Sequence, residues 1–163
     1  MTPIEHLQQR AKDLHLYGLL AHWHELADSG WVEQLLLWEE TERAKRSLER
    51  RLGSAHIGRF KPIADFDWNW PEQCDRTAIS ELLSLEFLNT AANAILVGAS
   101  GLGKSTLAQN IAHQAVLHGH TVLFTTAGQL LGDLAALDSD SALRRRLRYY
   151  ATPALLVIDE VGY

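Results

Sequence analysis

The sequence of 163 residues contains a single cysteine and no long run of apolar residues. One cysteine, Cys74, excludes both a disulfide framework and a cysteine-ligated zinc site. No segment approaches the roughly 18 consecutive apolar residues that a transmembrane helix requires. The N-terminal stretch MTPIEHLQQRAKDL also lacks the basic and then apolar layout of a signal peptide. We therefore expect a cytoplasmic protein with no membrane partner.

The eight histidines offer no convincing metal site, although two of them lie close together in the sequence. His22 and His24 are two positions apart, so their side chains point away from each other on a helix. We interpret the histidines as surface or partly buried side chains. With 47% hydrophobic and 21% charged residues, the chain has the composition of a globular protein and about the length of one domain.

The net charge of −5 conceals an uneven distribution along the chain. Residues 1–61 carry nine basic and nine acidic residues, whereas residues 62–163 carry six basic and eleven acidic residues. Between residues 43 and 61 there are seven basic residues and one acid, Glu49. This local basic patch is more informative than the total charge, because a partner contacts one surface and not the average.

Arg43, Arg46 and Arg50 of this patch share one face of an expected helix, and Arg51 adjoins them. Two interpretations stay open for these four arginines: contact with the phosphates of double-stranded DNA, or a solvated surface that is partly ion-paired. A second basic cluster, RRRLR at residues 144–148, has the same two interpretations, with acidic residues just upstream as possible partners.

Three regions follow one another along the chain. Residues 1–55 read as a small helical N-terminal domain that begins with a capping box and a proline in the first turn, Thr2-Pro3-Ile4-Glu5. Its longest predicted helix covers residues 31–52, with Gly53 as the stop. Residues 56–75 form a connector whose large aromatics predict packing and not a free tether. Residues 76–163 carry the motifs described below.

The third region alternates short apolar runs with helical patterns. We predict strands at residues 94–97, 121–124 and 154–158, and helices at residues 76–90, 105–118, 129–137 and 141–150. Short, wholly apolar strands that alternate with helices are typical of a parallel sheet covered on both faces. The sequence therefore predicts an α/β fold.

The stretch GASGLGKS, residues 98–105, matches the phosphate-loop pattern G-x-x-x-x-G-K-[ST]. Small residues let backbone N–H groups turn inward around phosphates, and the following helix favours an anion at its N-terminus. Lys104 would reach the β- and γ-phosphates, and the hydroxyl of Ser105 would bind Mg²⁺. The predicted nucleotide-binding residues of this loop are Gly98, Ala99, Ser100, Gly101, Leu102, Gly103, Lys104 and Ser105.

A second element of such a site follows the last predicted strand, where LLVI leads into Asp159 and Glu160. In phosphate-loop enzymes a second strand carries an aspartate that helps to hold Mg²⁺, and Asp159 fits that role. Glu160 fits a general base that polarises the attacking water, with Lys104 as its catalytic partner on the γ-phosphate. An Asp-Glu pair favours a nucleotide hydrolase over a kinase-like phosphotransferase.

These motifs together resemble the IstB-like and DnaC-like AAA+ ATPases, a family of P-loop NTPases. The likeness extends from RAKRSLERRL through the connector element Phe66-Asp67-Trp68 to IDEVGY, and the IstB-like branch fits the combination better. The resemblance implies ATP as the nucleotide and Mg²⁺ as the metal, and it brings Thr106 close to the nucleotide. It also implies a helper protein of insertion-sequence transposition that assembles as a homo-oligomer on DNA and activates a transposase.

The resemblance further implies parts that follow the Asp-Glu strand: a sensor strand, an arginine finger and a helical lid. In that fold the sensor strand lies between the phosphate-loop strand and the Asp-Glu strand. The α/β core is then expected to be incomplete at its C-terminus, and this chain alone to be poorly stable or to pair its strands differently. Two alternatives stay open, a DnaC-like helicase loader and a truncated fragment without catalytic activity.

Overall fold

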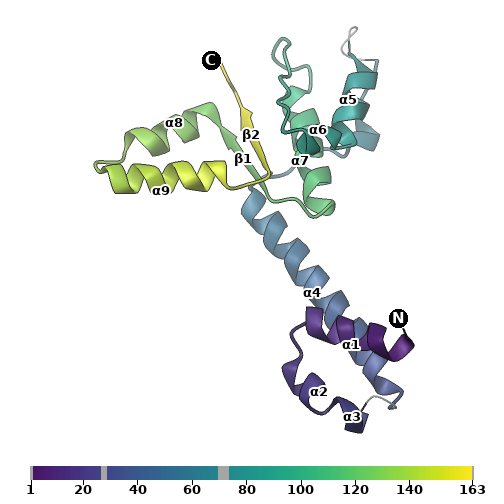
Figure 1. The fold of residues 1–163 in the computed structure, drawn as a ribbon. Helices are drawn as coiled ribbons and strands as arrows, with labels where there is room; N and C mark the ends of the chain where they lie inside the picture. The colour runs from purple at the N-terminus through teal and green to yellow at the C-terminus, as the bar shows by residue number, and fades with distance from the viewer. Residues whose placement is uncertain (1, 27–28, 70–73, 163) are drawn as a thin grey trace. The chain divides into compact units, whose positions relative to one another are not determined.

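The computed structural model describes residues 2–26, 29–69 and 74–162 (Figure 1). The chain divides into two compact units, Met1–Glu49 and Arg50–Tyr163. None of the helices within the described ranges is both long enough and apolar enough to cross a membrane. We describe each unit by itself.

The first unit is helical. It contains α1 (Pro3–Asp13), α2 (Tyr17–Ala21), α3 (Trp23–Leu26) and the larger part of α4 (Trp31–Ala55). The predicted capping box is confirmed, since the Thr2 hydroxyl accepts a hydrogen bond from the amide of Glu5 and the Glu5 carboxylate accepts one from the amide of Thr2. The buried residues that form the core of this unit are Ala11, Leu14, Trp23, Val32 and Leu36.

A two-pronged ion pair joins α1 to α4 at the edge of this core. The Arg10 guanidinium donates to both carboxylate oxygens of Glu40, at 2.7 and 2.8 Å. The pKa of the Glu40 carboxyl is lowered, chiefly by this hydrogen bond. A bidentate ion pair of this kind fixes the relative orientation of the two side chains and strengthens the contact between them.

Helix α4 runs past the predicted stop, so the expectation that Gly53 ends it is wrong. The helix continues to Ala55, whose side chain is fully buried, and His56 then adopts a left-handed conformation with φ of 54°. Burial of Ala55 favours continuation of the helix against the small helical penalty of a glycine. The apolar spacing over residues 18–28 predicts one helix, but the structure divides this segment into α2 and α3, and residues 27–28 lie outside the described part.

The second unit contains a two-stranded parallel sheet of β1 (Val122–Thr126) and β2 (Leu155–Asp159). The register pairs Val122 with Leu155 and Thr126 with Asp159. Helix α7 (Lys104–Leu117) precedes β1 and packs against both strands, and α8 (Ala127–Ala135) and α9 (Asp140–Ala151) connect β1 to β2. The predicted α/β fold with a parallel sheet is confirmed by these elements.

The prediction of a strand at residues 94–97 is wrong. These residues join no sheet in the described part of the chain, and the side chains of Ile95 and Val97 are 86% and 89% exposed. A strand exists only through hydrogen bonds to a neighbour, and here β2 pairs with β1 alone.

The predicted helix over residues 76–90 is also interrupted. It forms α5 (Arg76–Leu83) and the single turn α6 (Glu86–Asn89), with Leu85 between them at φ of 64°. Leu85 is buried, so packing of this side chain accounts for a backbone conformation that leucine rarely adopts. A short 3₁₀ helix, η1 (Ile63–Asp65), lies in the connector.

Candidate nucleotide-binding site

The loop of residues 98–103 leads directly into α7. Gly101 and Gly103 have φ angles of +81° and +84°, a left-handed conformation that glycine adopts without strain. Gly103 is the N-cap of α7, and its carbonyl accepts the first hydrogen bond of that helix, from the amide of Leu107 at 2.9 Å. The local geometry is therefore that of a tight glycine turn that opens a helix.

The Lys104 side chain folds back across this loop. Its Nζ donates to the carbonyl oxygens of Gly98 and Ala99, each at 2.7 Å. The structure thus brings the first two residues of the loop together with the lysine that follows it. An ammonium has three N–H donors, and two of them are used by these carbonyls.

The other loop residues lie on the surface or near it. Ser100 and Gly101 are exposed, and Leu102 is half-buried, with one methyl group against the Gly98 position. Ser105 is exposed in the first turn of α7, and the half-buried Thr106 accepts a hydrogen bond at its carbonyl from Asn110.

Asp159 and Glu160 lie at the carboxyl end of β2. Asp159 is half-buried, and its Oδ1 accepts a hydrogen bond from the Glu160 amide at 2.9 Å. Glu160 is exposed and left-handed, with φ of 56°, which is uncommon for a residue other than glycine. Strained backbone of this kind occurs often at functional sites.

The topology places the two halves of the candidate site toward the same end of the sheet. Helix α7 ends at Leu117 and β1 begins at Val122, so the C-terminal end of α7 adjoins the start of the strands. Because β1 and β2 are parallel, the N-terminus of α7 is directed toward the end of β2 that carries Asp159 (Figure 1). Within the described residues, no hydrogen bond or ion pair joins the two halves directly.

The oxygen donors at these positions fit a magnesium ion bound together with phosphates. Ser105 offers a hydroxyl and Asp159 a carboxylate, and Mg²⁺ prefers oxygen ligands. The described ranges contain no group of three or more histidine, cysteine or acidic side chains that could hold a metal. A metal here would therefore depend on phosphate and water oxygens for most of its ligands, as Mg²⁺ does in nucleotide sites.

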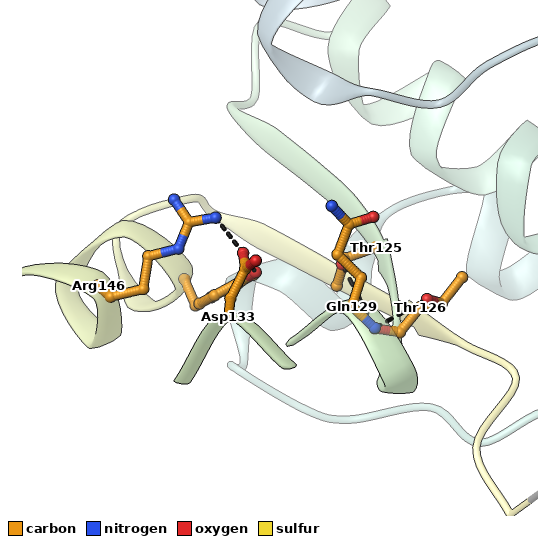
Figure 2. Close-up of polar contacts among 6 residues, drawn as sticks. Thr125, Thr126, Gln129, Asp133 and Arg146 are labelled. Carbon is orange, nitrogen blue, oxygen red and sulfur yellow. Dashed lines mark hydrogen bonds and ion pairs between the residues drawn. The ribbon is translucent and has the colours of Figure 1, made fainter. Parts of the chain in front are cut away.

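A second polar cluster lies between α8 and α9, beside a cavity of about 360 Å³. Arg146 forms an ion pair with Asp133, and the hydroxyl of the buried Tyr150 donates to the same carboxylate at 2.6 Å. Figure 2 shows Arg146 directed toward Asp133, with Gln129 beside Thr126, to which its backbone amide donates. The central arginine of RRRLR is thus held by Asp133, a residue further upstream than the acidic partners expected from the sequence.

The four arginines of the basic patch differ in their contacts. Arg43 forms an ion pair with Glu39 at 3.2 Å on the surface of α4. Arg46 and Arg50 are exposed on the same helix. Arg51 is half-buried, and its Nε donates to the carbonyl of Val116 at 3.3 Å. Arg51 therefore differs from the other three arginines, because its guanidinium joins the end of α4 to α7 within the second unit.

The connector contributes residues near the phosphate loop that its sequence alone did not identify. The ring of Phe66 lies against Gly103, and the buried amide of Asn110 donates to the carbonyl of Lys61 at 2.8 Å. The signal in the sequence was weak: an asparagine among the apolar residues of a helix, and an aromatic residue in the connector. Their partners lie too far away in the sequence to be read from it.

Comparison with known proteins identifies related sequences. The family described as IstB-like ATP binding protein matches residues 5–163. An ATP-binding protein of insertion sequence IS5376 from Geobacillus stearothermophilus is 30% identical, over 98% of this chain and 67% of the relative. One of insertion sequence IS21 from Pseudomonas aeruginosa is 34% identical, over 74% of this chain and 46% of the relative. The matches thus span about half to two-thirds of the length of these relatives.

Proposed function

The chain belongs to the IstB-like ATP-binding protein family, and from that premise we propose that it binds ATP with Mg²⁺ and serves an insertion sequence as a helper of DNA transposition. The observation that carries the nucleotide part is the loop geometry. A left-handed Gly103 opens α7, and Lys104 Nζ lies within the loop on the carbonyls of Gly98 and Ala99. Phosphate oxygens would replace these carbonyls as the partners of the ammonium.

Each site residue has a role in this proposal. Amides of the loop and of the first turn of α7 surround the phosphates, and Lys104 neutralises the β- and γ-phosphates. Ser105 and Asp159 hold Mg²⁺, with Thr106 close to the nucleotide. Mg²⁺ supplies charge neutralisation on the phosphates when bound.

Glu160 is the residue that we assign to water activation. It is exposed at the end of β2, and its backbone is fixed by the hydrogen bond to Asp159. A carboxylate in this place accepts a proton from a water that attacks the γ-phosphate. ATP binding is the primary proposal, and hydrolysis is the activity that Glu160 would add to it.

Double-stranded DNA and a transposase are the proposed partners, in the cytoplasm, with a homo-oligomer as the assembled form. The relatives above are named for insertion sequences, which supports a transposition helper over a helicase loader. Arg43, Arg46 and Arg50 on α4 supply charge for contact with DNA phosphates.

Titration of the purified chain with ATP and Mg²⁺ by calorimetry tests the nucleotide proposal. We expect Lys104→Ala to weaken binding about 10- to 100-fold, since hydrogen bonds to charged groups are worth about 1.5–3 kcal/mol. Lys12→Ala, which removes an exposed lysine from α1, should leave the affinity unchanged. Asp159→Asn should reduce the gain in affinity that Mg²⁺ provides. Wild-type protein that binds no ATP, or binds as well with Lys104→Ala, would contradict the proposal.

A further inference from the structure

The connector lies along α7 in the opposite direction to the helix. Just before the connector, Arg51 of α4 bonds to the carbonyl of Val116 in the last turn of α7. Within the connector, the ring of Phe60 meets that of His113, with centroids 5.3 Å apart. Further along, Phe66 reaches Gly103, where α7 begins. The connector therefore follows α7 from His113 to the phosphate loop.

Side-chain amides of α7 fix the connector by bonding to its backbone. Gln109 Nε2 donates to the carbonyl of Ile57 at 2.9 Å, and Asn110 Nδ2 donates to that of Lys61 at 2.8 Å. Asn110 is 7% exposed, and a buried side-chain amide left without its acceptor costs free energy. These bonds hold the connector in one register on α7, so that Phe66 has a defined place.

Phe66 packs directly on Gly103. A Cβ atom added to Gly103 would lie 2.7 Å from Cε2 of Phe66 and 3.2 Å from its Cζ, so the ring occupies the space that a side chain would take. Phe66 also packs edge-on against Trp68 at 4.9 Å between centroids, and the Arg76 guanidinium lies 4.8 Å from the centroid of the Trp68 ring. The ring of Phe66 thus contacts both the phosphate loop and Trp68.

From this arrangement we propose that Phe66 is a positioning residue of the phosphate loop. Its ring holds Gly103 in the left-handed conformation, and Gly103 determines where Lys104 leaves the backbone. From that position the Lys104 ammonium reaches the carbonyls of Gly98 and Ala99. The inference rests on the proposed nucleotide binding for its functional consequence, while its structural content, the order of the loop, is independent of any ligand.

Two variants of Phe66 and one matched control test the proposal in the full chain. Phe66→Ala removes the ring, and Phe66→Tyr keeps it. Phe60→Ala removes a ring from the same connector at a site that faces His113 and not the loop. We would measure amide hydrogen exchange of residues 98–108 without nucleotide, and ATP affinity by calorimetry with Mg²⁺, both well below the melting temperature. Phe66→Leu replaces Phe66→Ala if the alanine variant does not fold.

We expect Phe66→Ala to speed exchange in residues 98–108 and to weaken ATP binding about tenfold, because a less preorganised loop must be ordered on binding. Phe66→Tyr should restore both measurements, and Phe60→Ala should change neither. Unchanged exchange and affinity in Phe66→Ala would overturn the proposal, as would equal effects in Phe60→Ala. If the wild-type chain binds no ATP, the proposed function fails, and loop exchange alone decides the role of Phe66.

Discussion

Asp133 illustrates how one side chain joins two helices of the second unit. It lies on α8 and receives hydrogen bonds from Tyr150 and Arg146 of α9. The guanidinium of Arg146 also lies 4.5 Å from the ring centroid of Tyr149. The pKa of the Asp133 carboxyl is lowered, first by the hydrogen bond from Tyr150 and then by that from Arg146. Burial is the main cause of the raised pKa of the Tyr150 hydroxyl.

This lowered pKa predicts a dependence of stability on pH. A carboxyl whose pKa is lower in the folded state stabilises the protein above its unfolded pKa of about 3.9. The contribution is then lost as the pH falls through the lower, folded value. We expect Asp133→Asn to melt at a lower temperature than wild type at neutral pH, and the difference to shrink as the pH falls below about 4. Thermal melts followed by circular dichroism across this range measure it.

Asp138→Asn is the matched control for this prediction, because Asp138 lies between α8 and α9 and outside the cluster around Asp133. Its melting temperature should follow that of wild type at every pH. If the difference in melting temperature between wild type and Asp133→Asn stays constant down to acidic pH, the charge of Asp133 contributes nothing to the stability of the fold.

Residues differ in how far their roles can be read from sequence. The positive φ angles of Gly101 and Gly103 can be anticipated from the local motif, because glycine adopts such a conformation in a tight loop without strain. Phe66, Asn110 and Asp133 act through partners that lie 13 or more positions away in the chain. No local pattern specifies such a partner, so only the folded structure reveals these contacts.

At the scale of elements, local pattern predicts best where a segment buries one face by itself. Helix α7 and strands β1 and β2 are close to their predicted positions, because α7 and β1 bury many of their apolar side chains and β2 pairs with β1. The run at residues 94–97 has the same apolar character, but it pairs with no strand in the described part of the chain. Strand formation is a property of a pair of segments, which a single apolar run does not specify.

Helix α4 carries the prediction about DNA. We expect the triple variant Arg43→Ala, Arg46→Ala and Arg50→Ala to bind double-stranded DNA more weakly. The slope of log affinity against log salt should fall by about 0.9 for each phosphate that the variant no longer neutralises. Arg51 is left unchanged because its guanidinium bonds to Val116. Fluorescence anisotropy with labelled DNA over a series of salt concentrations provides both measurements.

The variant Lys12→Ala controls for removal of positive charge outside the basic patch, since Lys12 is exposed on α1. It should leave the salt slope close to that of wild type. Equal affinity and slope in wild type and the triple variant would remove α4 as the DNA-binding element while leaving the nucleotide proposal intact.

At the scale of the whole molecule, the division into two units is the main organisation. The first unit encloses its own small core, with Leu36 and Val32 almost completely buried. The second unit combines a two-stranded sheet with residues 94–97, whose apolar side chains Ile95 and Val97 are exposed. The core of the first unit could be anticipated from amphipathic patterns in the sequence. The exposure of Ile95 and Val97 in the second unit depends on which strands pair, and sequence periodicity does not determine that pairing.

Exposed Ile95 and Val97 lead to a prediction about association of the nucleotide-free chain. An apolar segment with unpaired backbone groups is a template for pairing with another chain. We expect sedimentation velocity to show assemblies that grow with protein concentration, and the thermal transition to be broad and to shift with protein concentration. The double variant Ile95→Lys and Val97→Lys should shift the chain toward monomer, because charge on such a segment opposes edge-to-edge pairing. The control is the double variant Leu131→Lys and Val161→Lys, whose side chains are 64% and 71% exposed elsewhere in this unit. This control should not shift the chain toward monomer. Wild-type protein that sediments as one species at every concentration and melts cooperatively would contradict the expectation, because residues 94–97 would then need neither a partner strand nor protection from one.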